Sequence, residues 1–152
     1  MPLKQIGIAL AILALAACDP VCSSRPPAPT GTQHLVFTGP QAGTITDAKT
    51  NCTHYPDQKQ VNFFIGSVLN NQQLGMTIQI NGYDSPRTYP VGSLLDGAGE
   101  VRLQVGTFDA SSTTGAGTVT VDSDGKSGSL KVDLLNGEHV EGTFRCEKVD
   151  TG

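Results

Sequence analysis

The amino-acid sequence predicts an all-β domain, either an antiparallel β-sandwich or a small barrel. Apolar and polar residues alternate with a period of two in several short runs, among them residues 76–80 and 101–105. That period is typical of strands with one buried face. Turn dipeptides separate the later runs, namely Asp124-Gly125 and Asn136-Gly137. The chain also holds 18 glycines and no tryptophan, and its sequence shows no long helical pattern.

The expected strands follow one another along the chain with turn residues between them. Residues 61–68 are apolar on both faces, which predicts a central strand, and Asn70 with Asn71 marks the turn after it. Asp124-Gly125 predicts a type I′ hairpin turn, and Asn136-Gly137 predicts a second one. The other expected strands lie at residues 35–37, 44–46, 76–80, 101–105, 118–121, 130–134 and 140–146.

The N-terminus combines one positive charge with a short apolar run. Lys4 is the only charged residue before residue 18, and residues 6–17 are apolar. A run of this length is too short to cross a bilayer comfortably and is typical of a cleaved signal helix. It ends in Leu15-Ala16-Ala17-Cys18, which resembles the lipobox of bacterial lipoproteins. The resemblance implies cleavage before Cys18 and a lipid on its sulfur, and two or more acyl chains make a stable anchor.

The rest of the chain divides into a tether and a domain. Residues 18–33 are rich in Pro, Ser and Thr and poor in large apolar residues, so we expect a disordered tether. Residues 34–150 form the expected β-domain. Without residues 1–17, nine Lys and Arg stand against fourteen Asp and Glu, and this acidic balance argues against nucleic acid as a partner. The expected location is a cell membrane, lipid-anchored, facing the periplasm or the cell exterior.

The remaining cysteines predict one disulfide. An exported protein meets an oxidising compartment, and with Cys18 lipidated the chain keeps Cys22, Cys52 and Cys146. Three single pairings are possible. We favour Cys52 with Cys146, because both flank β-rich segments whereas Cys22 lies in the tether. Cys22 would then be a free thiol or an intermolecular link.

Few residue patterns in the sequence predict chemistry. Residues 122–125 (Asp-Ser-Asp-Gly) resemble the start of a calcium loop, but Lys126 stands where a further oxygen ligand is needed. His34, His54 and His139 have no spacing that would place two of them on one metal ion. We therefore expect no enzyme activity, no metal and no cofactor.

One loop is a candidate binding site. Residues 83–90 hold two of the three tyrosines, an arginine and two prolines. Tyr83 and Tyr89 could stack on a sugar or anchor a protein contact, with Arg87 as a charged donor. In the alternative, both rings cap the open end of the sandwich.

The lipobox, the tether and the β-domain together resemble small bacterial surface lipoproteins, in particular the mycobacterial lipoprotein antigen type. The matching elements are Cys52 after an early strand, the Asp124-Gly125 turn, and a last strand ending in Cys146. The resemblance implies a surface-displayed β-sandwich that engages an envelope or host partner, protein or glycan. Our hypothesis is a non-catalytic, membrane-anchored binding module of the cell envelope. Two alternatives stay open: a periplasmic inhibitor of a basic hydrolase such as lysozyme, and a carrier of an apolar ligand.

Overall fold

The computed structural model describes residues 33–92 and 97–152, and within them the fold is nearly all β-strand. The all-β prediction is therefore confirmed. Residues 1–32, with the predicted signal peptide, Cys18, Cys22 and nearly all of the tether, lie outside the described residues. The elements are β1 (His34–Thr38), β2 (Gly43–Ile45), β3 (Lys49–Tyr55), η1 (Pro56–Gln58), β4 (Gln60–Leu69), β5 (Gln72–Asn81), β6 (Thr88–Val91), β7 (Ala98–Val105), β8 (Phe108–Val121), β9 (Ser127–Leu134), η2 (Leu135–Gly137), β10 (His139–Arg145) and β11 (Lys148–Thr151).

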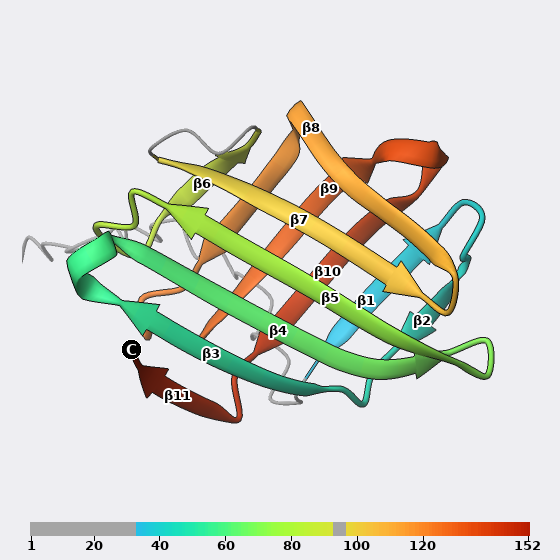
Figure 1. The fold of residues 1–152 in the computed structure, drawn as a ribbon, viewed down its shortest axis with the longest axis horizontal. Helices are drawn as coiled ribbons and strands as arrows, with labels where there is room; N and C mark the ends of the chain where they lie inside the picture. Colours follow the sequence, from blue (N-terminus) through green and yellow to red (C-terminus); the bar gives the residue numbers. More distant parts are fainter. Residues whose placement is uncertain (1–32, 93–96) are drawn as a thin grey trace, which may run out of the picture.

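The strands form one curled sheet that faces itself as two layers (Figure 1). The strand order is β11-β3-β4-β5-β7-β6-β8-β9-β10-β1-β2. We call β11, β3, β4, β5 and β7 the front layer, and β9, β10, β1 and β2, which cross behind them in Figure 1, the back layer. The result is a half-barrel in which each layer has an inner face toward the other layer and an outer face.

Strand β8 carries the sheet from the front layer to the back layer. Its first residues pair with β7 and its last residues pair with β9. Between Ser112 and Gly117 the register with β9 shifts, and an irregularity of this kind bends a strand. Strand β6 fills the space that opens between β7 and β8 at one end, pairing with both of them.

The sheet departs from the predicted antiparallel pattern at two pairings within the described part of the chain. β11 pairs with β3 in parallel, and so does β6 with β7. The sequence analysis did not identify β3, β6 or β11 as strands. β3 carries polar residues at most positions, β6 contains Pro90, and all four residues of β11 are exposed, so none of them shows the apolar period on which the prediction depended.

The turns agree with two of the three predicted dipeptides. Asn70 and Asn71 both have positive φ angles, 53° and 62°, as do Asn136 and Gly137 at 65° and 77°, and a type I′ turn needs positive φ at both central residues. The prediction of a type I′ turn at Asp124-Gly125 is wrong, because Gly125 has a positive φ but Asp124 does not.

In the turn at Asp124-Gly125, the side chain of Asp124 accepts hydrogen bonds from backbone N–H groups. Its Oδ1 accepts hydrogen bonds from the backbone N–H groups of Lys126 and Ser127 at 2.8 and 3.0 Å. Asp residues often hydrogen-bond the backbone just after them in this way, which favours a longer loop over a two-residue turn.

The inner faces of the two layers form a continuous apolar core. Ile65, Met76 and Leu103 point inward from the front layer, and each is at most 2% exposed. Phe63 of the front layer and Phe144 of the back layer meet edge to face with ring centroids 4.8 Å apart. The space between the layers is thus filled by side chains, and this packing holds the half-barrel closed.

A disulfide joins the front layer to the end of β10. Cys52 in β3 pairs with Cys146, the pairing that the sequence analysis favoured, and their Cα atoms are 5.8 Å apart. Glu147 donates its backbone N–H to the carbonyl of Thr50 beside this bond. Gln33 is buried and donates to the carbonyl of Arg145, and β11 ends at Thr151.

Candidate functional site

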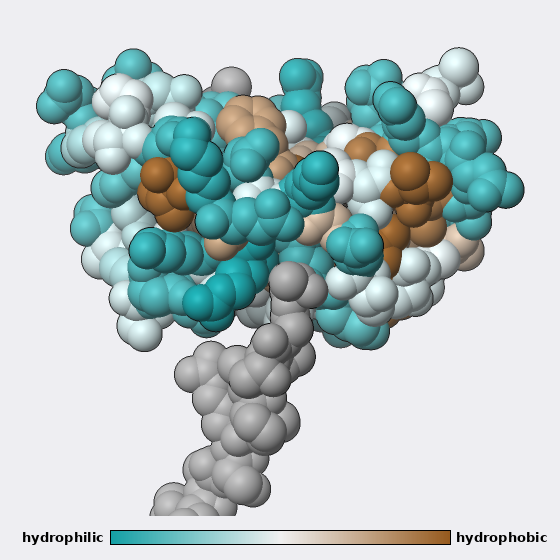
Figure 2. Space-filling model, turned by 90° about the horizontal axis from the view of Figure 1, so that it is seen from below, coloured by the Kyte–Doolittle hydropathy of each residue, from teal (hydrophilic) through white to brown (hydrophobic). Residues whose placement is uncertain are grey.

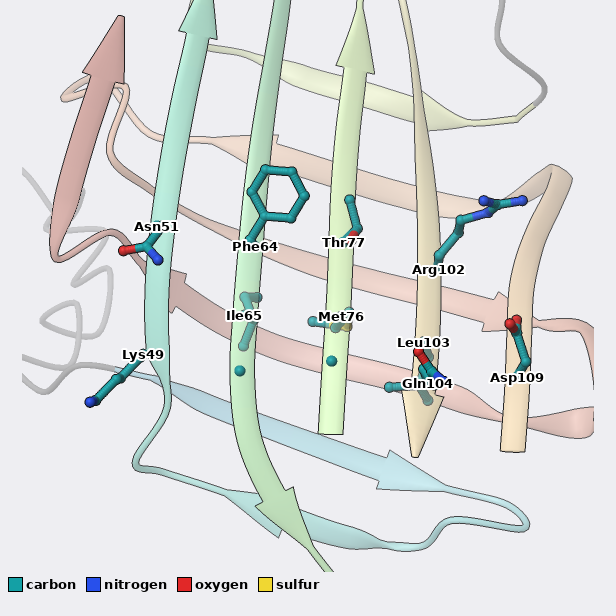
Figure 3. Close-up of a pocket in the computed structure, with 12 residues that line it drawn as sticks. Lys49, Asn51, Phe64, Ile65, Met76, Thr77, Arg102, Leu103, Gln104 and Asp109 are labelled. Carbon is teal, nitrogen blue, oxygen red and sulfur yellow. The ribbon is translucent and has the colours of Figure 1, made fainter. Parts of the chain in front are cut away.

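The outer face of the front layer holds a hollow of about 460 Å³ (Figure 3). It spans β3, β4, β5 and β7 and reaches the start of β8. The strands beneath it are rigidly paired along their length, so the hollow does not depend on a loop for its shape. A second hollow shares Lys49 and Gly66 with it and lies along β4 toward Val68, which is 61% exposed.

A pair of glycines forms the floor of the hollow. The strand register places Gly66 of β4 directly opposite Gly75 of β5. Lys49 lies opposite Gly66 on one side, and Gln104 lies opposite Gly75 on the other. Directly paired residues of neighbouring strands project to the same face, so these four form one row across the sheet. We call them the glycine row; its two middle positions lack side chains.

The fold does not require glycine at either of these positions. A Cβ atom built on Gly75 would have no heavy atom within 4 Å, and one built on Gly66 would meet only the carbonyl oxygen of Lys49 at 4.0 Å. Neither glycine has a positive φ. Glycine inside a strand costs roughly 0.5–1 kcal/mol relative to alanine, and it often marks a place where a ligand or another backbone approaches closely.

An exposed aromatic ring borders the glycine row. Phe64, two residues before Gly66, is 44% exposed on the outer face. Figure 3 shows it between Asn51 of β3 and Thr77 of β5, and the register pairs it with both of these residues. The hollow therefore offers an apolar ring next to an amide and a hydroxyl group.

The charges at the hollow nearly balance one another. Arg102 lies opposite Thr77, and its Nε is 3.2 Å from the carboxylate of Glu100. Lys49 stands at the β3 end and Asp109 at the β8 end of the hollow, and Figure 3 shows these two residues on opposite sides of it. Such an arrangement has no strong field of one sign to attract a highly charged ligand.

The predicted binding loop is brought together, but its groups bind one another. Tyr89 has no exposed surface, and its hydroxyl is within hydrogen-bond distance of the Ser85 carbonyl and the Asp84 carboxylate. Arg87 stacks over the Tyr89 ring at 4.5 Å from the centroid and binds Asp84 at 3.1 Å. Tyr83 is half-buried between Tyr89 and the edge of His54.

Tyr89 is thus held inside the fold by contacts within the loop, and the binding role of Tyr83, Arg87 and Tyr89 stays a prediction. A hydrogen bond from the Ser85 hydroxyl lowers the pKa of the Asp84 carboxyl; desolvation opposes this, and bonds from Arg87 and Tyr89 reinforce it. Burial raises the pKa of Tyr83, and the neighbouring Tyr89 raises it further. The side chains of Asp84, Arg87 and Tyr89 bind one another within the loop. A ligand could therefore contact only Tyr83 and the solvent-facing side of the Arg87 guanidinium.

The histidines take separate structural positions. His139 on β10 lies 2.7 Å from Asp133 and 3.5 Å from Glu141, whereas His54 packs on Tyr83. Among residues 33–92 and 97–152, no group of three or more His, Cys, Asp or Glu side chains could hold a metal ion.

Within the same residues, none of the helical elements is long and apolar enough to span a membrane. The face seen from below in Figure 2 is mostly hydrophilic, and its apolar residues form separate patches rather than one continuous surface. A continuous apolar patch of several hundred square ångströms is what usually marks a large protein contact.

No protein-family model matches this chain, and neither a curated protein nor a solved structure is similar enough to count as a match.

Sequence reasoning did not find the hollow, although its residues carry a signal. Phe64, Gly66 and Gly75 lie at positions of β4 and β5 that alternate with buried neighbours, Ile65 and Met76. Because Ile65 and Met76 face the core, this alternation places an aromatic residue and two glycines on the exposed face, where β-branched residues are usual. The sequence alone showed residues 61–68 as apolar on both faces and did not show that the two glycines are paired.

Proposed function

We propose that this protein is a lipid-anchored, non-catalytic binding module of the bacterial cell envelope that holds its ligand in the hollow on the front layer. The observation that carries the binding role is the glycine pair. Two glycines without a conformational or steric requirement stand opposite each other at the floor of a hollow, beside an exposed Phe64. The anchor is supported by the resemblance of Leu15-Ala16-Ala17-Cys18 to a lipobox.

The position of the hollow suits a tethered module. It lies on the outer face of a sheet whose inner face is filled by the core, so a ligand reaches it without any opening of the fold. The same packing favours an outer site over the alternative in which an apolar ligand is carried between the layers. Exported proteins commonly use a disulfide to hold a small domain together, and the Cys52–Cys146 bond is of that kind.

The anchor is tested by fractionation and intact mass of the protein expressed in a bacterium. We expect wild-type protein in the membrane fraction, lacking residues 1–17 and carrying the mass of acyl chains. Cys18→Ala should release the protein from the membrane, whereas Cys22→Ser, the matched control in the same segment, should not. A wild-type protein that retains residues 1–17, or that is cleaved without lipid, would contradict the anchor.

The binding role is tested separately with the full chain purified from membranes. Isolated cell-wall, membrane and periplasmic protein fractions are passed over immobilised wild-type protein and over Gly75→Thr, in which a side chain fills the hollow. We expect one fraction to retain a component on the wild type alone. Equal retention by both proteins would exclude the hollow as the site.

A further inference from the structure

We propose that the hollow binds a linear, uncharged glycan, with its sugar rings lying on the glycine row and against Phe64. This inference rests on the proposed function, because it names the ligand class of the same site. Three properties of the hollow support it: the shape of its floor, the chemistry of its border, and the state of the backbone beneath it.

The floor has the extent of a short oligosaccharide. Between Lys49 and Gln104 the glycine row crosses three strand-to-strand steps with no side chain at its two middle positions. Neighbouring strands are about 4.8 Å apart, so the row covers about 14 Å. A chain of pyranose rings, which are chairs with two broad faces, can lie close to such a surface, whereas a bulky helix would contact the rims and leave the floor empty.

The border offers what the two kinds of sugar surface require. The C–H face of a pyranose ring is apolar and packs on aromatic rings, and Phe64 presents 44% of its surface beside the floor. The hydroxyl groups of a sugar need both donors and acceptors, and the side chains of Asn51, Thr77 and Gln104 around the floor provide both. The balance of charge between Arg102 and Glu100 favours an uncharged chain over an acidic one.

The backbone state argues against an extended peptide as the occupant. A peptide that binds by adding a strand needs a sheet edge with unpaired N–H and C=O groups. β4 and β5 are interior strands over the length of the hollow, because β4 pairs with β3 and β5, and β5 pairs with β4 and β7. A peptide on this face would leave its own backbone groups without partners from the sheet, at a cost in free energy, whereas a glycan has no amide backbone to satisfy.

The test is calorimetric titration of the full lipidated protein in a detergent without sugar head groups. The probe is the β-1,4-linked tetramer of N-acetylglucosamine, and the comparison ligands are cellotetraose and an uncharged extended hexapeptide. We expect at least one tetrasaccharide to bind and the peptide not to bind. Phe64→Ala should weaken the affinity at least tenfold, and Gly75→Thr should abolish binding while the melting temperature stays equal or rises. Lys131→Ala, on the outer face of β9, is the control and should bind as the wild type does.

Three results would overturn the inference: no binding of either tetrasaccharide at millimolar concentration, unchanged sugar affinity in Gly75→Thr, or binding of the peptide in place of the sugars. Sedimentation velocity on the same samples tests whether a second copy of the chain occupies the hollow. A dimer that the wild type forms and that Gly75→Thr abolishes would identify that occupant and would also overturn the inference. Failure here leaves the membrane anchor untouched, because Cys18→Ala and intact mass test the anchor alone. Conversely, if intact mass finds no lipid on the wild-type protein and that protein still binds the sugar, the anchor is contradicted and the inference is supported.

Discussion

The two layers of the half-barrel use glycine for opposite reasons. In the back layer, a Cβ atom on Gly142 would lie 2.0 Å from the backbone oxygen of His34, and Gly142 has a φ of +139°. In the front layer, Gly66 and Gly75 have open space and no positive φ. The back-layer glycine is needed for two strands to approach each other. The front-layer pair is not needed by the fold, which is why we propose that it serves binding.

Two aromatic residues of the fold differ in their exposure. Tyr89, on β6 between β7 and β8, is fully buried with its hydroxyl bonded, whereas Phe64 exposes its ring on the outer face of the front layer. A buried aromatic with a satisfied polar group contributes to stability. An exposed one on the outer face of a sheet contributes little to stability and remains available to a ligand.

The largest effect is expected at the bond that joins the front layer to the end of β10. Cys52→Ser or Cys146→Ser should destabilise the folded protein by about 2–5 kcal/mol, the usual cost of losing a native disulfide in a small exported domain. Urea unfolding of each variant measures the change. Cys22→Ser is the control, and a loss of similar size in that variant would contradict the assigned pairing.

Substitution of the two kinds of glycine tests the comparison directly. Gly142→Ala should cost about 3 kcal/mol or more, because the methyl group meets the backbone of β1 and the positive φ is strained for alanine. Gly66→Ala, in the front layer, should change the free energy of unfolding by less than about 1 kcal/mol. Chemical denaturation of both variants checks this, and equal losses would break the contrast between the layers.

The hydroxyl group of Tyr89 tests whether the loop at residues 83–89 serves the fold. Tyr89→Phe removes the donor to the Ser85 carbonyl, and we expect a loss of about 1 kcal/mol, the usual net value of such a hydrogen bond. Thermal unfolding measures it, and glycan affinity should not change. If Tyr89→Phe lowered the glycan affinity without lowering the melting temperature, this loop would be a binding site.

Replacing a glycine of the front-layer pair, Gly66 and Gly75, should raise the stability of the fold and abolish ligand binding. Gly75→Thr should stabilise the fold by about 1 kcal/mol, because threonine favours strands and glycine loses more backbone entropy on folding. A melting curve and the calorimetric titration are compared on the same sample. If the variant is less stable than the wild type, the glycine has a structural role and the hollow is a by-product of it.

The smallest effect concerns pH at the Asp124 turn. Desolvation raises the pKa of Asp124, but hydrogen bonds from the Lys126 N–H and from Ser127 together outweigh it, so the pKa is lowered from its ordinary value of 3.8. A carboxyl with a lowered folded-state pKa stabilises the fold above the unfolded value and loses that contribution as the pH falls through the folded value. The group is largely exposed, so the contribution is small.

The pH experiment compares wild-type protein with Asp124→Asn. Stability measured from neutral pH downward should fall more steeply in the wild type below about pH 4, because the variant has no carboxyl to protonate at this position. Parallel curves would show that the turn does not depend on the charge of Asp124.

Most of the strands could be predicted from local pattern, whereas the site could not. Residues 76–80 and 101–105 have a clear period of two, and Asn70-Asn71 needs positive φ, so these elements follow from nearby residues alone. The hollow requires Gly66 to stand opposite Gly75, and that pairing depends on the register of two strands. Register follows from the hydrophobic face and the turn together, and the sequence pattern of 61–68, apolar on both faces, did not show which side is buried.

By itself the sequence determined the all-β class, the positions of the strands with a strong period, and the favoured Cys52–Cys146 pairing. These depend on residues close together in the chain, or on the small number of cysteines. Only the tertiary structure decided that β8 turns the sheet back on itself, that Tyr89 is buried, and that an exposed Phe64 borders two unobstructed glycines. Each of these depends on contacts between strands far apart in the chain, because burial and free space are properties of the packed sheet and not of any one segment.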